Sequence, residues 1–294
     1  MGIKKCFTSR FGDEGYIMEA DFSQLEVIGA ALVSGDPMMK KDILDGVDSH
    51  SQSASWLHPQ HTYEEIREGY LAEDPHFTKM RKNAKAPRFE LQYGARAPGI
   101  ARNNKLPLEV AQGFIDRYYD RYAVLKAFQD KLLRHCENNL VPSSDRLPTG
   151  HPAMMAYWQN PYTKRRLNFQ QQAAPEFLQK RNVFGTISPT QVANYPMQSF
   201  ATGDVMPEVI GAVGEAIWFS ELRQQCLPIN TVHDSIIFDV HADVLVEAGR
   251  LVKKTMESAP ELMQKRFGEH LDLPFPVDVE YGHDWEDIKH LDLT

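Results

Sequence analysis

Short runs of mainly apolar, β-prone residues predict strands near both ends of the chain. Residues 16–21 are β-prone and end in an acid, which is typical of a short strand. Residues 229–232 and 236–240 are two further β-prone runs, and they flank His233-Asp234-Ser235. These two runs predict a hairpin whose turn holds Asp234 or lies beside it.

Apolar residues at helical spacing fill most of the chain between these strands. Leu25, Ile28 and Leu32 predict a helix directly after the first strand, and Gly35-Asp36-Pro37 ends it. Residues 142–189 are rich in Gln, Asn, Pro and Arg, and we expect loops with short strands there. The pattern therefore indicates an α+β fold. The remaining predictions are helices at 38–111, 108–138, 205–222 and 242–267, loops near 48–50 and 97–99, and a last strand at 275–280.

Composition excludes several classes of protein. With 294 residues and 42% hydrophobic content, the chain can bury a real core in one large or two medium domains. No apolar run approaches the length of a membrane span, and the N-terminus lacks an apolar signal segment. We therefore expect a soluble, cytoplasmic protein with no membrane partner. Cys6, Cys136 and Cys226 are few and widely spaced, which fits reduced thiols better than a disulfide framework or a zinc site.

The net charge of −8 argues against a nucleic-acid partner until the distribution of charge is considered. Between residues 79 and 105 there is one acid, Glu90, against eight Lys and Arg residues. Positive charge is thus concentrated in one stretch of an acidic chain. For a smaller cluster, Lys164-Arg165-Arg166, we expect a solvated basic face.

One stripe of side chains lies within the basic stretch. Arg81, Lys85, Phe89 and Tyr93 recur at intervals of four, which places them along one face of a helix, and Gly94 follows. Two cations followed by two aromatics suit a nucleoside triphosphate, because cations can meet the phosphates and rings can pack against sugar and base. An amphipathic helix with core aromatics and solvated cations explains the same spacing. The stripe alone leaves both interpretations open.

Two acids stand at the edges of predicted strands. Asp21 ends the first strand and Asp234 lies at the hairpin turn. If the strands are neighbours in one sheet, the two carboxylates can hold a pair of Mg²⁺ ions ~3.5–4 Å apart, as in-line phosphoryl transfer requires. Acids at strand ends and turns also commonly bond to their own backbone. Spacing alone does not bring residues 21 and 234 together.

Several motifs, in the right order, resemble those of family A DNA polymerases of the bacterial DNA polymerase I type. Among these polymerases, the sequence is more similar to bacteriophage members. The segment from Asp21 to Glu26, the stripe from Arg81 to Gly94, and Val232-His233-Asp234 are similar to the family's motifs A, B and C. Residues 194–198 and 48–50 resemble two further segments. The resemblance covers nearly the whole chain. It implies a polymerase palm, with an antiparallel sheet and packing helices, at residues 1–33 and 191–294, and a mostly helical fingers insertion at 34–190.

The resemblance also implies a function, template-directed DNA polymerisation by two-Mg²⁺ nucleotidyl transfer of dNMP to a primer 3′-hydroxyl, with primer-template DNA and dNTPs as partners. Asp21, Asp234 and Lys85 are the implied catalytic residues, and the Phe22 carbonyl is an implied third metal ligand. Glu26 is expected to block a 2′-hydroxyl. The implied nucleotide-binding residues are Arg81, Lys85, Phe89, Tyr93, Gly94, Glu26, Gln24 and His50, and the implied DNA-binding residues are Gln198, His233 and Asn194.

The sequence departs from the family pattern at several positions. Ser235 stands where the family usually has Glu, Pro87 falls inside the predicted stripe helix, and Thr190 replaces an Arg. Pro87 is expected to kink that helix or to rotate Phe89 away from Lys85. A thumb and an exonuclease domain are expected to be absent, so we expect half of a split polymerase, completed by a second polypeptide with the thumb and N-terminal palm, or a truncated one. The alternatives are a non-catalytic DNA-binding remnant and a metal-dependent nuclease.

Overall fold

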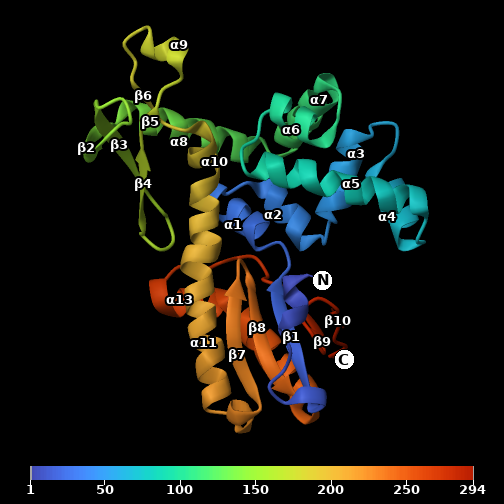
Figure 1. Cartoon of the computed structure of the whole chain (residues 1–294). Helices are drawn as coiled ribbons and strands as arrows, with labels where there is room; N and C mark the ends of the chain where they lie inside the picture. The colour runs from blue at the N-terminus through green and yellow to red at the C-terminus, as the bar shows by residue number, and fades with distance from the viewer. Residues whose placement is uncertain (1, 294) are drawn as a thin grey trace. The chain divides into compact units, whose positions relative to one another are not determined.

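A computed structural model of the chain describes residues 2–293, which divide into two compact units (Figure 1). Unit 1 comprises the described parts of Met1–Leu32 and Met197–Thr294, and unit 2 is Val33–Pro196. Each unit is built from segments that the apolar pattern assigns to strands and helices. The names palm and fingers stay predictions for the two units.

Unit 1 is built on a five-stranded antiparallel sheet with the strand order β10-β9-β1-β8-β7. The predicted first strand, the hairpin and the late strand are all confirmed. β8 is buried at six of its seven residues, because it is an inner strand with alternating faces that are both covered. The strands are β1 (Gly15–Phe22), β7 (Cys226–Val232), β8 (Ser235–His241), β9 (Val277–Gly282) and β10 (Lys289–His290).

Helices pack against this sheet, with α12 in contact with β1, β8 and β9 and α11 in contact with β7. Pro207 lies in the first turn of α11, where its missing N–H is not needed. The single helix predicted at 242–267 is two helices, because the chain breaks at Ser258 and Pro260 starts a new first turn. The helices are α1 (Leu25–Ser34), α11 (Met206–Trp218), α12 (Leu245–Glu257) and α13 (Ala259–Phe267), with a π-helical segment at Ser199–Val205.

Unit 2 is mostly helical, as predicted. The Asp48 carboxylate accepts hydrogen bonds from the N–H groups of His50 and Ser51 and so starts α3, which occupies most of the loop expected near 48–50. The loop expected near 97–99 is wrong: α6 starts there, with Pro98 in its first turn. The helices are α2 (Pro37–Leu44), α3 (Ser49–Leu57), α4 (Tyr63–Leu71), α5 (Pro75–Gln92), α6 (Ala97–Asn104), α7 (Leu108–Arg121), α8 (Ala123–Asn138), α9 (Glu176–Gln179) and α10 (Pro189–Gln198).

The predicted region of loops and short strands forms a small antiparallel sheet, β2-β3-β4, and a separate pair, β5-β6. The sheet packs on α8 through a cluster that includes Leu132 and Cys136 of the helix and Ala156 and Phe169 of the sheet. The strands are β2 (Val141–Arg146), β3 (Pro152–Gln159), β4 (Arg166–Gln170), β5 (Gln172–Ala173) and β6 (Gly185–Thr186).

Within residues 2–293, no helix combines the length and the apolar character that a membrane crossing needs. Cys6 is exposed, Cys136 and Cys226 are buried, and all three thiols are free, as predicted.

Candidate active site

The two candidate metal-binding acids lie side by side in unit 1. β1 pairs with β8 so that Asp21 is opposite Ser235, and the Phe22 N–H donates to the Asp234 carbonyl at 3.2 Å. The condition set by the sequence, that the two strands are neighbours in one sheet, is therefore met. The turn that carries Asp234 is tight, with His233 at φ +55°.

The carboxyl groups of this pair do not ionise at their ordinary pKa. Partial desolvation, followed by repulsion from Asp234 and Glu19, raises the pKa of Asp21 to about 7, although the residue is solvent-exposed. Desolvation also raises the pKa of Asp234, while a side-chain hydrogen bond with Asp21 lowers it in part. A hydrogen bond between two carboxyl groups requires a proton on one of them. Ionisation of both carboxyl groups is thus unfavourable without a cation.

The donor set fits a hard divalent cation. Two oxygen-bearing side chains that compete for one proton can exchange that proton for Mg²⁺, which takes few protein ligands and keeps several waters. Among residues 2–293, no group of three or more His, Cys, Asp and Glu side chains is arranged to hold a metal. The pair Asp21 and Asp234 is thus the candidate, and the Phe22 carbonyl stays a predicted third ligand.

Ser235, which replaces the family's Glu, has a structural position. It is 3% exposed, and its hydroxyl donates to the Val232 carbonyl at 3.0 Å across the turn. A buried hydroxyl that closes the turn is unsuited to binding a metal beside Asp234. The site therefore relies on the two aspartates.

The other predicted residues of unit 1 surround the start of α1. Gln24 is exposed in the left-handed region at φ +64°, and its carbonyl accepts the first hydrogen bonds of the helix, from Val27 and Ile28. Gln198 donates its amide to the Glu26 carboxylate at 3.4 Å. The Ser23 hydroxyl donates to Asp278 at 2.6 Å. The contact from Gln198 orients the Glu26 side chain, and the contacts of Gln24 and Ser23 hold the start of α1.

The stripe in unit 2 lies on α5, and its first member is tied to an acid. Arg81 donates from Nε and Nη2 to the two oxygens of Asp48 at 2.7 and 3.0 Å, and its guanidinium lies 4.2 Å from the centre of the Tyr70 ring. This bidentate pair lowers the pKa of Asp48 to about 2, against the effect of burial, which raises it. Because Asp48 also starts α3, it fixes the stripe helix to the helix that carries His50.

His50 has a strongly depressed pKa. Burial and the nearby charges of Arg81 and Lys85 lower the pKa of His50 to about 4. Its ring lies 6.0 Å from that of Phe89, centre to centre. At neutral pH this imidazole is uncharged, so it contributes hydrogen-bonding groups and no positive charge to the site.

The later members of the stripe face water. Lys85 is exposed, and Phe89 and Tyr93 are 47% and 41% exposed, which contradicts the interpretation that the aromatics of this helix fill the core. α5 runs unbroken through Pro87, which is itself buried. An exposed aromatic row beside cations is what a bound nucleotide needs.

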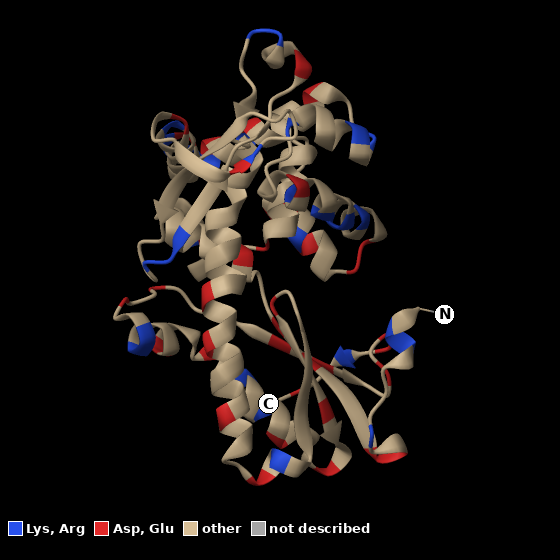
Figure 2. Cartoon of the chain, turned by 60° about the vertical axis from the view of Figure 1, so that its left-hand side comes forward, with Lys and Arg blue, Asp and Glu red and all other residues tan. Residues whose placement is uncertain are grey.

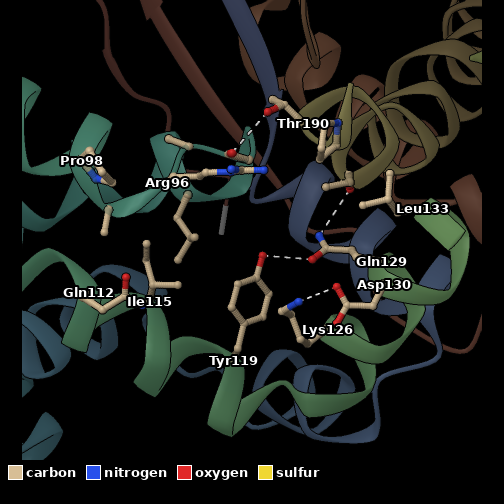
Figure 3. Close-up of a pocket in the computed structure, with 16 residues that line it drawn as sticks. Arg96, Pro98, Gln112, Ile115, Tyr119, Lys126, Gln129, Asp130, Leu133 and Thr190 are labelled. Carbon is tan, nitrogen blue, oxygen red and sulfur yellow. Dashed lines mark hydrogen bonds and ion pairs between the residues drawn. The ribbon is translucent and has the colours of Figure 1, made fainter. Parts of the chain in front are cut away.

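The C-terminal end of α5 borders a pocket of about 420 Å³, shown in Figure 3. Gly94 has φ +78°, and a Cβ there would lie 3.0 Å from the backbone of Thr190, so the close approach of α5 and α10 requires glycine. Thr190, the predicted departure, donates to the Gly94 carbonyl at 3.4 Å. Asn194, on the same helix, is 7% exposed, and its assignment as a DNA contact stays a prediction.

The sequence pattern of DNA polymerase family A matches residues 1–287 of the chain. The chain belongs to DNA polymerase family A. The DNA polymerase I of Lactococcus lactis subsp. lactis is 27% identical over 287 residues, which are 98% of this chain and 28% of that protein. The thermostable DNA polymerase I of Thermus filiformis is 25% identical over 98% of this chain and 29% of that protein.

A solved structure supports the fold. It is the POL domain of Pol1 from M. smegmatis in complex with DNA primer-template and dNTP, with a TM-score of 0.62 and 23% identity over 97% of this chain and 42% of that one. At this identity the likeness shows the fold alone. The chain spans less than a third of the length of the DNA polymerase I relatives.

Each family A motif thus occupies one unit, with motifs A and C in unit 1 and the stripe in unit 2. The roles of the individual residues stay predictions. Sequence reasoning gave no role to Asp48 beyond its place in a family segment. Its position two and three residues before His50 and Ser51 was the available signal, because Asp before a helix start is a common N-cap.

Proposed function

We propose that this chain carries the nucleotidyl-transfer site of a template-directed DNA polymerase, which uses dNTPs to extend a primer 3′-hydroxyl on a DNA template. The observation that carries the proposal is the pair formed by Asp21 near the end of β1 and Asp234 in the turn before the adjacent strand β8, whose raised pKa values favour a bound cation. Membership of family A and the exposed stripe on α5 indicate that the substrate at this cation site is a nucleoside triphosphate. The DNA polymerase I names of the relatives and the primer-template and dNTP in the solved structure point to the same reaction.

In this proposal Asp21, Asp234 and the Phe22 carbonyl hold Mg²⁺. When bound, Mg²⁺ makes the primer 3′-hydroxyl more acidic and neutralises charge on the reacting phosphates. The 3′-oxygen forms a bond to the α-phosphorus while the bond from that phosphorus to pyrophosphate breaks. Both aspartates must be ionised for this role, and cation binding favours that state.

The triphosphate is the proposed ligand of Arg81, Lys85 and His50. Asp48 occupies Nε and Nη2 of Arg81, so the remaining Nη1 group is the part of the fork proposed to reach a phosphate oxygen. Lys85 is exposed and, as an ammonium, donates a proton to the leaving pyrophosphate. His50 adds a neutral N–H donor. Phe89 then lies against the sugar, and Tyr93 and Gly94 border the templating pair.

Glu26 is the proposed determinant of sugar choice. Its carboxylate, oriented by Gln198, obstructs a 2′-hydroxyl and so favours deoxynucleotides. Gln198 and His233 are proposed contacts to the primer-template, with Gln24 beside the nucleotide. His233 is exposed at its turn, as a contact to DNA requires.

The test is single-nucleotide addition to a labelled primer with Mg²⁺ and dNTP. We expect product with the wild-type chain, none with Asp234→Ala, strongly reduced product with Lys85→Ala, and normal product with Lys82→Ala, which removes an exposed cation from another face of α5. Binding of primer-template without addition by the wild-type chain would establish the non-catalytic remnant. Primer shortening that needs Asp234 but not Lys85 would establish the nuclease.

The predicted second polypeptide is tested in the same format. The prediction requires processive extension to be absent from the purified chain and restored by a thumb-bearing partner. Long products from the purified chain alone would refute it, without affecting the proposed chemistry.

A further inference from the structure

The small sheet of unit 2 carries a charge opposite to that of the chain. The chain has a net charge of −8, yet residues 146–196 contain one acid, Glu176. The positive residues of that segment are Arg146, Lys164, Arg165, Arg166, Lys180 and Arg181. Figure 2 shows that the hairpin formed by β3 and β4 has Lys and Arg colouring and no Asp or Glu along its strands. Lys164 and Arg165 lie in the turn of this hairpin, and Arg166 begins β4.

The hairpin turn is held by a buried side chain. Asn160 is 2% exposed, and its carbonyl oxygen Oδ1 accepts from the N–H groups of Tyr162 at 2.8 Å and Thr163 at 3.3 Å. Its backbone N–H donates to the Arg165 carbonyl at 2.8 Å. Such an Asx arrangement fixes the loop. The side chains of Lys164, Arg165 and Arg166 are therefore exposed on an ordered support, and the Lys164 ammonium donates to the Pro161 carbonyl of the same turn.

The two faces of the hairpin differ in chemistry. Trp158 and Leu167 are opposite each other and pack against the cluster on α8. On the other face Tyr157 is opposite Asn168, and Gln159 is opposite Arg166. Gln159, Arg166 and Asn168 are exposed. This outer face thus presents amides, a guanidinium and the edge of an aromatic ring to solvent.

Arg166 forms a flat platform on that face. Its guanidinium lies 3.7 Å from the centre of the Tyr157 ring, which is a stacking distance. The nearest acid of the sheet, Asp145 on β2, accepts a hydrogen bond from Gln170 at 2.8 Å. A guanidinium that is stacked on one side has its other side available for a second planar group.

We infer that the outer face of the β3–β4 hairpin binds single-stranded DNA. The phosphates meet Lys164, Arg165 and Arg166, and an unpaired base stacks on the Arg166–Tyr157 platform. Unpaired bases explain the planar platform better than a duplex, whose stacked bases are hidden and which would use only the charges. This inference rests on the proposed function, because a template strand supplies the single-stranded DNA.

The test is fluorescence anisotropy of a labelled oligodeoxythymidine with the whole chain, measured over a series of salt concentrations. We expect Arg165→Ala/Arg166→Ala to bind roughly tenfold more weakly at low salt, and the slope of log affinity against log salt to fall by about 1.4, or ~0.7 for each lost phosphate contact. Lys254→Ala/Lys265→Ala, which removes two exposed cations from unit 1, is the charge-matched control and should bind as wild type.

The platform is tested with two substitutions of one residue. Tyr157→Phe keeps the stack and should bind as wild type, whereas Tyr157→Leu removes the ring and should weaken binding several-fold. Equal binding by wild type and the double Arg variant would overturn the inference, and so would equal losses in the double Arg variant and its Lys control. Equal loss of duplex and single-stranded binding would also overturn it, since charge alone would then explain the surface.

Failure of this inference is distinguishable from failure of the proposed function. Asp234→Ala should lose nucleotide addition and keep its affinity for oligodeoxythymidine. Arg165→Ala/Arg166→Ala should keep nucleotide addition on a template with a single unpaired nucleotide and lose single-strand affinity. Nucleotide addition that persists in Asp234→Ala would contradict the proposed function alone. Unchanged single-strand affinity in Arg165→Ala/Arg166→Ala would contradict this inference alone.

Discussion

The candidate sites of the two units have opposite electrostatics. In unit 1 partial desolvation, together with repulsion from nearby acids that include Asp234 in the adjacent turn, raises the pKa of Asp21 to about 7. In unit 2 cations surround His50 and help to lower its pKa to about 4. Both shifts start from burial and are increased by charges of a single sign. Each site therefore has an excess charge that favours a ligand of the opposite sign.

The two units also differ in how far they compensate that charge themselves. Unit 2 pairs Arg81 with Asp48 through two hydrogen bonds, and leaves Lys85 exposed with no ion-pair partner among the described residues. In unit 1 the Asp21 and Asp234 carboxyl groups have each other as neighbours. The comparison teaches that the electrostatics of unit 1 favour a cation and those of unit 2 an anion, which agrees with the proposed binding of Mg²⁺ and a nucleoside triphosphate.

The largest expected effect is that of Asp234→Asn. This substitution should reduce nucleotide addition by about 10³-fold or more, because a ligand of the catalytic cation is lost. It should also raise the Tm of the protein, since repulsion with Asp21 disappears. Single-turnover rates and thermal unfolding measure the two effects.

Asp243→Asn is the control, because it neutralises an exposed acid elsewhere in unit 1. It should leave the rate of nucleotide addition unchanged. A lower Tm for Asp234→Asn would contradict the view that the pair is mutually destabilising without a cation.

The next largest effect is expected for Lys85→Ala. Loss of a general acid should lower kcat for nucleotide addition by about 10²-fold, with little change in Tm because the side chain is exposed. A change confined to KM would show that Lys85 only binds the triphosphate.

A smaller effect is expected for Asp48→Asn, which keeps the shape of the side chain and removes its charge. We expect KM for dNTP to rise about tenfold, because Arg81 loses the anion that orients it. Asp74→Asn, which changes another N-cap in unit 2, should leave KM unchanged. If KM falls instead, Asp48 competes with the triphosphate for Arg81.

The smallest expected effect concerns pH and has opposite signs in the two units. For Asp21 the folded pKa is raised to about 7, so the folded state binds the proton more tightly and acidification from pH 7.5 to 5 stabilises unit 1. For His50 the folded pKa is lowered to about 4, so the unfolded state binds the proton first and the same acidification destabilises unit 2. Amide hydrogen exchange, read separately in each unit, measures both trends.

Two substitutions provide the controls for this pH experiment. Asp21→Asn should remove the trend in unit 1, and His50→Gln should remove the trend in unit 2. If both units respond to acid with the same sign, the electrostatic contrast between them is wrong.

Local sequence was enough to predict the strands β1, β7, β8 and β9 of unit 1. The hairpin around Asp234 follows from two β-prone runs with a turn between them, and the structure has β7 and β8 there. The pairing of β1 with β8 depends on contacts across more than 200 residues, which no spacing rule contains. Only the family resemblance indicated that Asp21 and Asp234 meet.

Errors in the predictions have local causes. Pro98 lies in the segment predicted as a loop, but a proline in the first turn of a helix leaves no hydrogen bond unmade. The pairing of Arg81 with Asp48 is not predicted, because the two residues lie 33 positions apart in the sequence. The stripe was predicted to consist of nucleotide contacts. Its first member, Arg81, is paired with the Asp48 carboxylate.

The most direct test of the opposite charge preferences is hydrogen exchange with each ligand separately. Mg²⁺ alone should slow exchange in β1 and β8 of the wild-type chain and have no effect there in Asp21→Asn/Asp234→Asn. A dNTP without Mg²⁺ should slow exchange in α3 and α5, and this protection should be lost in Lys85→Ala. Equal protection by Mg²⁺ in the wild-type chain and the double aspartate variant would contradict the account.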